Sequence, residues 1–273
     1  MVIVENLVVN SNKYFIYLNK FLKFRSFIAL TLQSLAAFSA LGGSAWALVF
    51  LERQNAALPL PKQSRWDKTA PLVIVDAGHG GHDGGAVANG IIEKNLALDL
   101  ARRVQHELEA VGLRVIMTRS SDTFLSLEAR AALAGTHRAA AFVSVHLNTD
   151  GEGNAAEGIE TYFAESQPLS SRQFIQTSVG TKAGTSVDFA STVQRMVCTA
   201  TKAQNRGTKA RSYAVVAQAP CPAVLVECGF ITSTAESARL KRNDYRDQIA
   251  AGIARGVALF LQTQPRLVAG SQG

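Results

Sequence analysis

Short apolar runs alternate along this chain with stretches in which apolar residues recur at every third or fourth position. The runs predict buried strands, and the periodic stretches predict helices that each bury one face. Alternation of strands and helices is typical of an α/β domain. The expected strands are residues 72–75, 114–118, 141–145, 158–163, 213–217 and 223–226, and the expected helices are residues 93–111, 126–134, 187–203, 234–242 and a last one that starts at Asp244.

A stretch without charged side chains precedes this domain. Residues 27–51 carry no charge and follow a segment with four basic residues and one acidic residue. About 20 apolar residues span a bilayer, and positive charge before them places the N-terminus in the cytoplasm. We therefore expect residues 1–51 to be a basic region and a membrane anchor or signal segment. Ala45-Trp46-Ala47 has the form of a cleavage site, so both fates stay open, with the uncleaved anchor preferred. The domain itself is expected to be periplasmic or extracytoplasmic, either membrane-anchored or secreted.

Composition indicates the remaining boundaries and the class of partner. Residues 52–71 hold three prolines among polar residues, which predicts a linker. Residues 72–262 form the expected domain, and residues 263–273 a flexible tail. The formal net charge of +7 suits an anionic partner. No basic block with interleaved aromatic residues occurs, so nucleic acid is not an expected partner. We expect a monomer.

The glycine-rich turn after the first expected strand carries the first candidate chemistry. His79 lies in this turn, and Glu93 begins the following helix. Ligand sites of open α/β sheets form at strand ends, and imidazole with carboxylate makes a zinc-type ligand set. The alternative is a turn that needs glycine for its backbone and exposes its polar side chains. A phosphate-binding loop is not favoured, because neither glycine motif for it fits.

Two later strands are followed by further candidate residues. His146 follows residues 141–145, and Glu227 follows residues 223–226. A second histidine at a strand end favours a meeting of both histidines at one edge of the sheet. A carboxylate directly after an apolar strand is costly to bury without a partner. Glu227 is therefore either a general base beside a metal or a glutamate that faces solvent.

Four segments stand in a characteristic order: VDAGHGG, the helix start at Glu93, SVHLN and VLVECGFIT. In this order and spacing the chain resembles, over residues 72–262, the zinc-dependent N-acetylmuramoyl-L-alanine amidases of bacterial cell-wall remodelling. The resemblance implies that His79, Glu93 and His146 bind Zn²⁺ and that Glu227 is the catalytic acid and base. It also implies a single three-layer domain, with a mixed, mostly parallel sheet flanked by helices.

The activity implied by the resemblance is hydrolysis of the amide bond between N-acetylmuramic acid and L-alanine in peptidoglycan. Zinc held by three protein ligands keeps a fourth position for water, and Glu227 would move the proton. The alternatives are a zinc peptidase or deacetylase of the cell envelope, and a non-catalytic wall-binding protein. The expected partners are peptidoglycan, the membrane through the N-terminal segment, and a protein activator.

Other polar residues near the motifs have two interpretations each. His82 is an alternative fourth ligand, whereas His106 and His137 are expected on the surface. Asp76 either orients His79 without binding the metal itself, or caps the turn.

Two arginines and three cysteines complete the candidates. Arg119 and Arg130 either bind carboxylates of the substrate's stem peptide or hold the edge of the sheet. Cys198 and Cys221 are a candidate disulfide pair after export, which would leave Cys228 as a buried thiol.

Overall fold

The computed structural model describes residues 68–151, 156–164 and 186–264. The expected basic region and membrane segment (1–51) lies outside these residues, as do most of the linker and most of the tail. Among the described helices, none is both long enough and apolar enough to cross a bilayer.

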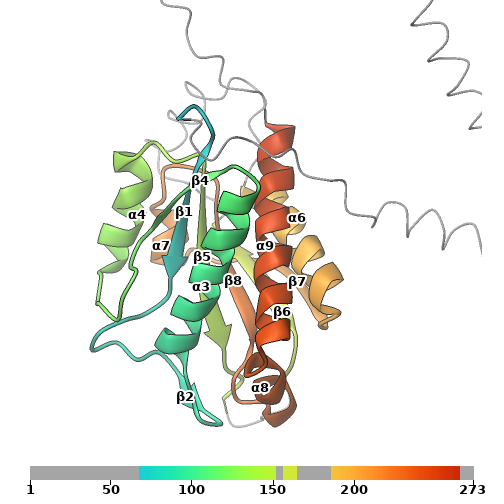
Figure 1. The fold of residues 1–273 in the computed structure, drawn as a ribbon. Helices are drawn as coiled ribbons and strands as arrows, with labels where there is room; N and C mark the ends of the chain where they lie inside the picture. Colours follow the sequence, from blue (N-terminus) through green and yellow to red (C-terminus); the bar gives the residue numbers. More distant parts are fainter. Residues whose placement is uncertain (1–67, 152–155, 165–185, 265–273) are drawn as a thin grey trace, which may run out of the picture. The chain divides into compact units, whose positions relative to one another are not determined.

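A six-stranded sheet forms the centre of the fold, with the strand order β4-β1-β5-β8-β6-β7 (Figure 1). The first four strands in this order run parallel, β6 pairs antiparallel with β8, and β7 runs parallel to β6. The expected α/β fold with a mixed, mostly parallel sheet is therefore confirmed. The strands are β1 (Leu72–Ala77), β4 (Arg114–Met117), β5 (Ala141–Asn148), β6 (Ile159–Phe163), β7 (Asn205–Ala210) and β8 (Ala223–Phe230), and a separate hairpin pairs β2 (Val87–Ala88) with β3 (Ile91–Ile92).

Helices cover both faces of the sheet, because successive strand residues point to opposite faces and both sets are apolar. One hydrophobic cluster joins the sheet to α3, α6 and α9, and a second joins its other face to α4 and α7 (Figure 1). α8 connects β8 to α9. The helices are α3 (Glu93–Ala110), α4 (Leu127–Thr136), α6 (Ser186–Thr201), α7 (Ala214–Ala217), α8 (Thr234–Leu240) and α9 (Asn243–Thr263).

The expected strand at residues 213–217 is wrong. These residues include the one-turn helix α7, whose Val215 and Val216 are buried in the second cluster. A short apolar run is equally consistent with a strand and with a buried helical turn, so the pattern of residues 213–217 could not separate the two. The strand that the sequence did not predict is β7, whose sequence NRGTKA lacks an apolar pattern and which lies at the sheet edge.

Ser233 and Glu236 have the spacing of a capping box, which predicts a helix start at residue 234, and the structure confirms this pattern only in part. Ser233 accepts a hydrogen bond from the backbone N–H of Glu236, as expected for an N-cap. The carboxylate of Glu236 does not return the bond, as a full capping box would require. It accepts instead from the backbone N–H groups of Gly158 and Phe230, and so ties β6 to β8.

The candidate disulfide is absent. None of the three cysteines forms a disulfide. Cys198 packs against the cluster under α6 and α9, whereas Cys221 belongs to the cluster on the opposite face of the sheet. The sheet therefore separates the two sulfur atoms, and Cys228 is a buried thiol as expected.

Candidate metal centre

A row of polar residues crosses the sheet near the ends of β1, β5 and β8. His146 of β5 lies opposite Glu227 of β8, and Glu227 lies opposite Glu160 of β6. The neighbours of these residues along each strand face the α3 side, so the three side chains point to the α4 side. His146 and Glu227 lie within their strands rather than after them, because pairing continues beyond the apolar part of β5 and β8.

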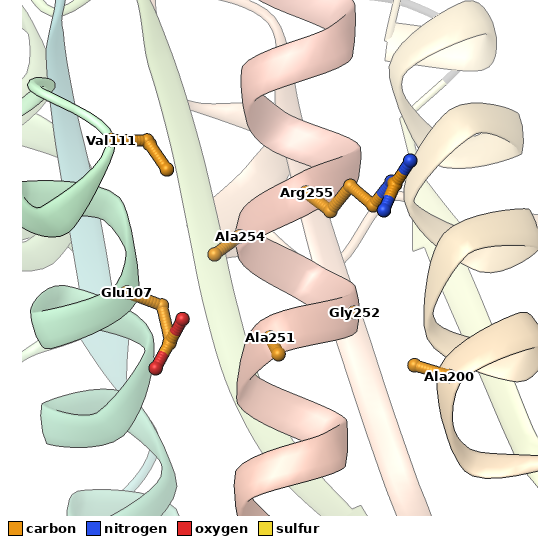
Figure 2. Close-up of a pocket in the computed structure, with 7 residues that line it drawn as sticks. All are labelled: Glu107, Val111, Ala200, Ala251, Gly252, Ala254 and Arg255. Atoms are coloured by element: carbon orange, nitrogen blue, oxygen red, sulfur yellow. The ribbon is translucent and has the colours of Figure 1, made fainter. Parts of the chain in front are cut away.

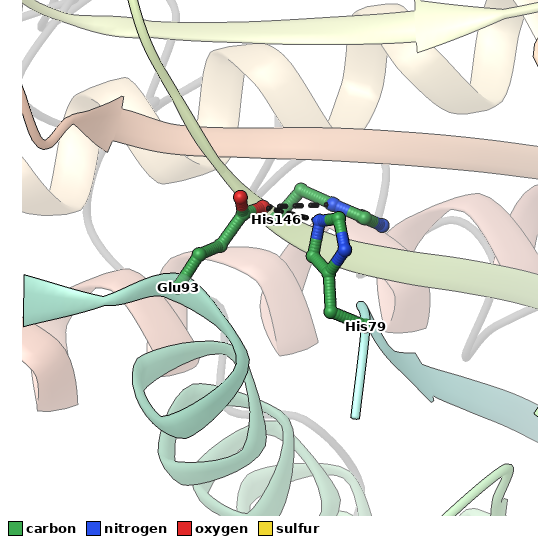
Figure 3. Close-up of side chains that lie close together, drawn as sticks. All are labelled: His79, Glu93 and His146. Carbon is green, nitrogen blue, oxygen red and sulfur yellow. Dashed lines mark hydrogen bonds and ion pairs between the residues drawn. The ribbon is translucent and has the colours of Figure 1, made fainter. Parts of the chain in front are cut away.

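His79, Glu93 and His146 converge at one end of this row (Figure 3). Nε2 of His79 lies 3.1 Å from Oε1 of Glu93, and Nδ1 of His146 lies 3.0 Å from the same oxygen. One donor atom from each side chain lies within 4.8 Å of the others. Two imidazoles and one carboxylate at this spacing make a metal-ligand set.

Neighbouring groups hold His79 and Glu93 in place. His79 adopts a left-handed conformation with φ of 57°, and its Nδ1 lies 2.9 Å from a carboxylate oxygen of Asp83. Glu93 stands at the N-terminus of α3, and its carboxylate accepts the backbone N–H groups of Ala86 and Leu147. Asp83 therefore fixes the orientation of the His79 ring, a role that the sequence analysis did not assign. The spacing of four residues between His79 and Asp83 was the signal in the sequence for this contact.

The charges of the cluster stabilise one another. Burial alone would raise the pKa of Glu93, but hydrogen bonds from His146 and His79 hold it well below its usual range. Burial alone would lower the pKa of each histidine, but contacts with Glu93 raise both above the ordinary value. A cation at the centre of the set would replace the protons that the imidazoles otherwise carry.

Glu227 differs from the other carboxylates of the row. The residue is only partly buried, but its Oε2 is inaccessible to solvent and has no hydrogen-bond partner among the described residues. The pKa of Glu227 is raised to about 7, chiefly because burial disfavours its charged form. The positive charge of His146 opposes this rise, and the negative charges of Glu93 and Glu160 add to it. The carboxyl group can therefore both accept and donate a proton near neutral pH.

Residues 73–258 match the family model described as N-acetylmuramoyl-L-alanine amidase. The chain belongs to this amidase family. It is 32% identical over 188 residues to the N-acetylmuramoyl-L-alanine amidase LytC of Bacillus subtilis (strain 168), a match that covers 69% of this chain and 35% of LytC. It is also similar to the crystal structure of the N-acetylmuramoyl-L-alanine amidase from Clostridium difficile 630, with 33% identity, a TM-score of 0.63, and coverage of 71% of this chain and 98% of that chain. The CwlD amidase from Clostridioides difficile, in complex with the GerS lipoprotein, matches with 26% identity and a TM-score of 0.61 over 70% of this chain and 98% of that chain.

Asp76 has a structural role in this amidase. It is buried and accepts hydrogen bonds from Thr118 at 2.7 Å, from Ser144 at 2.6 Å and from Arg130 at 2.9 Å. It contacts neither the side chain of His79 nor the backbone N–H groups of the turn. The turn-capping expectation is therefore wrong, because the acceptor positions of Asp76 are used by side chains from three other segments. Asp76 acts on His79 only through Arg130, which also donates to the carbonyl of His79.

Arg119 and Arg130 hold the backbone of the turn that carries His79. Arg119 donates to the carbonyls of Ala77 and Gly78, and Arg130 donates to those of Ala77 and His79. Both side chains are buried. Of the two interpretations, recognition of stem-peptide carboxylates is therefore wrong, because these guanidinium groups are buried and already paired.

The remaining histidines lie outside the metal-ligand set. His82 is exposed and its ring contacts that of Phe124 in a tilted arrangement, with centroids 4.1 Å apart, so it is not a fourth member of the set. His106 and His137 are exposed, as expected.

A hollow of about 250 Å³ lies between α3, α6 and α9 (Figure 2). The charged residues in its lining are Glu107 and Arg255, which do not form a metal-ligand set. It borders the helices on the face opposite the polar row. The candidate chemistry of this amidase is therefore on the other side of the sheet, where His79 and His146 remain partly exposed.

Replacing Gly78 with alanine should displace His146 and weaken metal binding. A Cβ atom at Gly78 would lie 2.4 Å from Cε1 of the His146 ring, so the ring must move. We expect the affinity for an added divalent metal ion to fall by about 10- to 100-fold, as for loss of an orienting contact. Competition with a chromophoric chelator measures this affinity.

Gly84→Ala is the matched control for this prediction. Gly84 lies in the same turn, and a Cβ atom there would meet nothing within 4 Å. The affinity of Gly84→Ala for the same metal ion should equal that of the wild type. Equal affinities of Gly78→Ala and Gly84→Ala would contradict the prediction.

Proposed function

We propose that this chain is a zinc-dependent hydrolase that cleaves the amide bond between N-acetylmuramic acid and L-alanine in peptidoglycan. The family match over residues 73–258 supports the choice of bond. One observation carries the catalytic assignment: in the described part of the chain, Oε2 of Glu227 is buried without a partner, beside His146. An unpaired buried carboxylate is costly, and such cost is typical of functional sites.

His79, Glu93 and His146 are the proposed ligands of Zn²⁺. Two histidines and one glutamate are the ligands of several catalytic zinc sites, and neutral imidazole suits this ion. When bound, zinc supplies a Lewis acid that activates water and polarises a carbonyl group. Asp83 keeps Nδ1 of His79 occupied, which leaves Nε2 for the ion.

Glu227 is the proposed acid and base. Its carboxylate accepts a proton from the attacking water and returns a proton to the amide nitrogen as the C–N bond breaks. The products are a carboxylate on the muramic acid side and the free amino group of L-alanine. A pKa of about 7 suits a group that must take up and release a proton within one reaction.

The proposed site of action is outside the cytoplasm, where peptidoglycan lies. Residues 1–51 would serve as the membrane anchor or signal segment and residues 52–71 as the linker. Residues 72–262 would form the catalytic domain, followed by the tail 263–273. A protein activator is also proposed, by analogy with the CwlD amidase in complex with a lipoprotein.

The test is mass spectrometry of the fragments that the full-length protein releases from purified peptidoglycan. We expect free stem peptides that begin with L-alanine, absent after treatment with a chelator and restored by zinc. Loss of a C-terminal amino acid from intact glycopeptides would identify a peptidase instead, and release of acetate a deacetylase. Intact glycopeptides after incubation with folded, zinc-loaded protein would contradict the proposed function.

A further inference from the structure

A cluster of basic residues continues the polar row beyond Glu227. β6 places Glu160 opposite Glu227, and β7 flanks β6 at the edge of the sheet. Glu160 is buried and forms ion pairs with Arg206 and Lys209 of β7. Arg211 directly follows β7 and is exposed. Two cations of β7 therefore pair with the carboxylate next to Glu227, and Arg211 adds a third cation at the end of the same strand, two strands away from β8.

This cluster keeps uncompensated positive charge. Within the described ranges, Glu160 is the carboxylate that pairs with Arg206 and Lys209, and none pairs with Arg211. Three positive charges against one negative charge leave a net charge of +2. The side chain of Lys209 is 42% exposed, so it remains accessible to a ligand although it contacts Glu160.

Two tyrosines orient the exposed cations. The rings of Tyr162 and Tyr213 meet edge to face, with centroids 5.1 Å apart. Nζ of Lys209 lies 5.8 Å from the centroid of the Tyr162 ring, and Cζ of Arg211 lies 6.0 Å from the same point. Cations over an aromatic face are held in position, which lowers the entropy lost when they bind an anion.

We propose that Lys209 and Arg211 bind a carboxylate of the substrate's stem peptide, on the second or third residue after the scissile bond. This proposal rests on the proposed function. Adjacent strands are about 4.8 Å apart, so β7 lies about 10 Å from β8 across the sheet. Lys209 pairs with Tyr162, two residues along β6 from Glu160, so its backbone lies about 12 Å from that of Glu227. An extended peptide covers about 3.3–3.6 Å per residue, so three to four residues span that distance, and the long side chain of Lys209 shortens it. The enzyme would therefore prefer acidic stem peptides over amidated ones.

The test compares two synthetic ligands, an N-acetylmuramoyl tetrapeptide with free carboxylates and the same peptide with these groups amidated. Calorimetry measures their binding to full-length, zinc-loaded protein that carries Glu227→Gln, a variant in which we expect turnover to be slowed about 10²- to 10⁴-fold. Adding Arg211→Gln should lower the affinity for the acidic ligand about fivefold, as for a partly exposed ion pair. The affinity for the amidated ligand should not change.

A control variant distinguishes binding at this site from a general effect of the protein's positive charge. Arg114→Gln removes an exposed cation at the opposite edge of the sheet and should change neither affinity. Equal loss for both ligands, no loss for either, or no binding of either would overturn the proposal. Hydrolysis by the wild type is scored separately. Absence of hydrolysis together with a carboxylate preference would refute the proposed function and leave this site standing.

Discussion

Glutamine in place of Glu227 should lower the rate of amide hydrolysis by about 10²- to 10⁴-fold, the usual contribution of a positioned acid and base. An amide cannot accept the proton from water or return it to the leaving nitrogen. The zinc content should not change, because His79, Glu93 and His146 remain in place. Chromatography of released stem peptides, together with metal analysis of the purified variant, measures both quantities.

Glu109→Gln is the control for this substitution. Glu109 lies in the last turn of α3, at the opposite end of the helix from Glu93. Its replacement removes the same charge and should leave hydrolysis at the wild-type rate. If Glu227→Gln hydrolysed peptidoglycan as fast as Glu109→Gln, the catalytic assignment would be wrong.

The stability of the metal-free Glu227→Gln variant checks that the lost activity is not a loss of fold. Burial raises the pKa of Glu227 from 4.5 to about 7, so between these pH values the unfolded carboxyl ionises before the folded one. The wild type therefore loses stability as pH rises through this window, and glutamine does not share that loss. At neutral pH the variant should unfold at the same temperature as the wild type or higher. A lower unfolding temperature would indicate structural damage.

Replacing Arg130 with methionine should cost about 3–5 kcal/mol of the free energy of unfolding, the effect of breaking a buried ion pair. The loss leaves the carboxylate of Asp76 buried without its cation. It also removes the donors that Arg130 provides to the carbonyls of Ala77 and His79. Urea denaturation followed by circular dichroism measures the change.

A double-mutant cycle distinguishes this ion pair from a simple packing effect. Asp76→Asn together with Arg130→Met should cost less than the sum of the single changes, because neither partner is then left charged and unpaired. Arg102→Met, on the exposed surface of α3, should change the free energy of unfolding by less than about 0.5 kcal/mol. A cost for Arg130→Met no larger than that of Arg102→Met would contradict the prediction.

Local patterns in the sequence were sufficient for most of the fold. The apolar runs at β1, β4, β5, β6 and β8 and the helical periodicity of α3, α6 and α9 predicted elements that the structure contains. These patterns are informative because the residues that a strand or an amphipathic helix buries are apolar and recur at a fixed spacing within a short segment. β7 shows no such pattern, since an edge strand with polar side chains is specified by its backbone pairing with β6.

The sequence by itself determined which side chains stand near strand ends, and so predicted His79, Glu93, His146 and Glu227 as one constellation. Only the tertiary structure decided how these groups are held. The left-handed backbone of His79 depends on an arginine 51 positions away, and Asp76 binds that arginine across 54 positions. The register that sets Glu160 opposite Glu227 likewise joins β6 to β8. Such contacts follow from packing between distant segments, and no local pattern of apolar and polar residues encodes them.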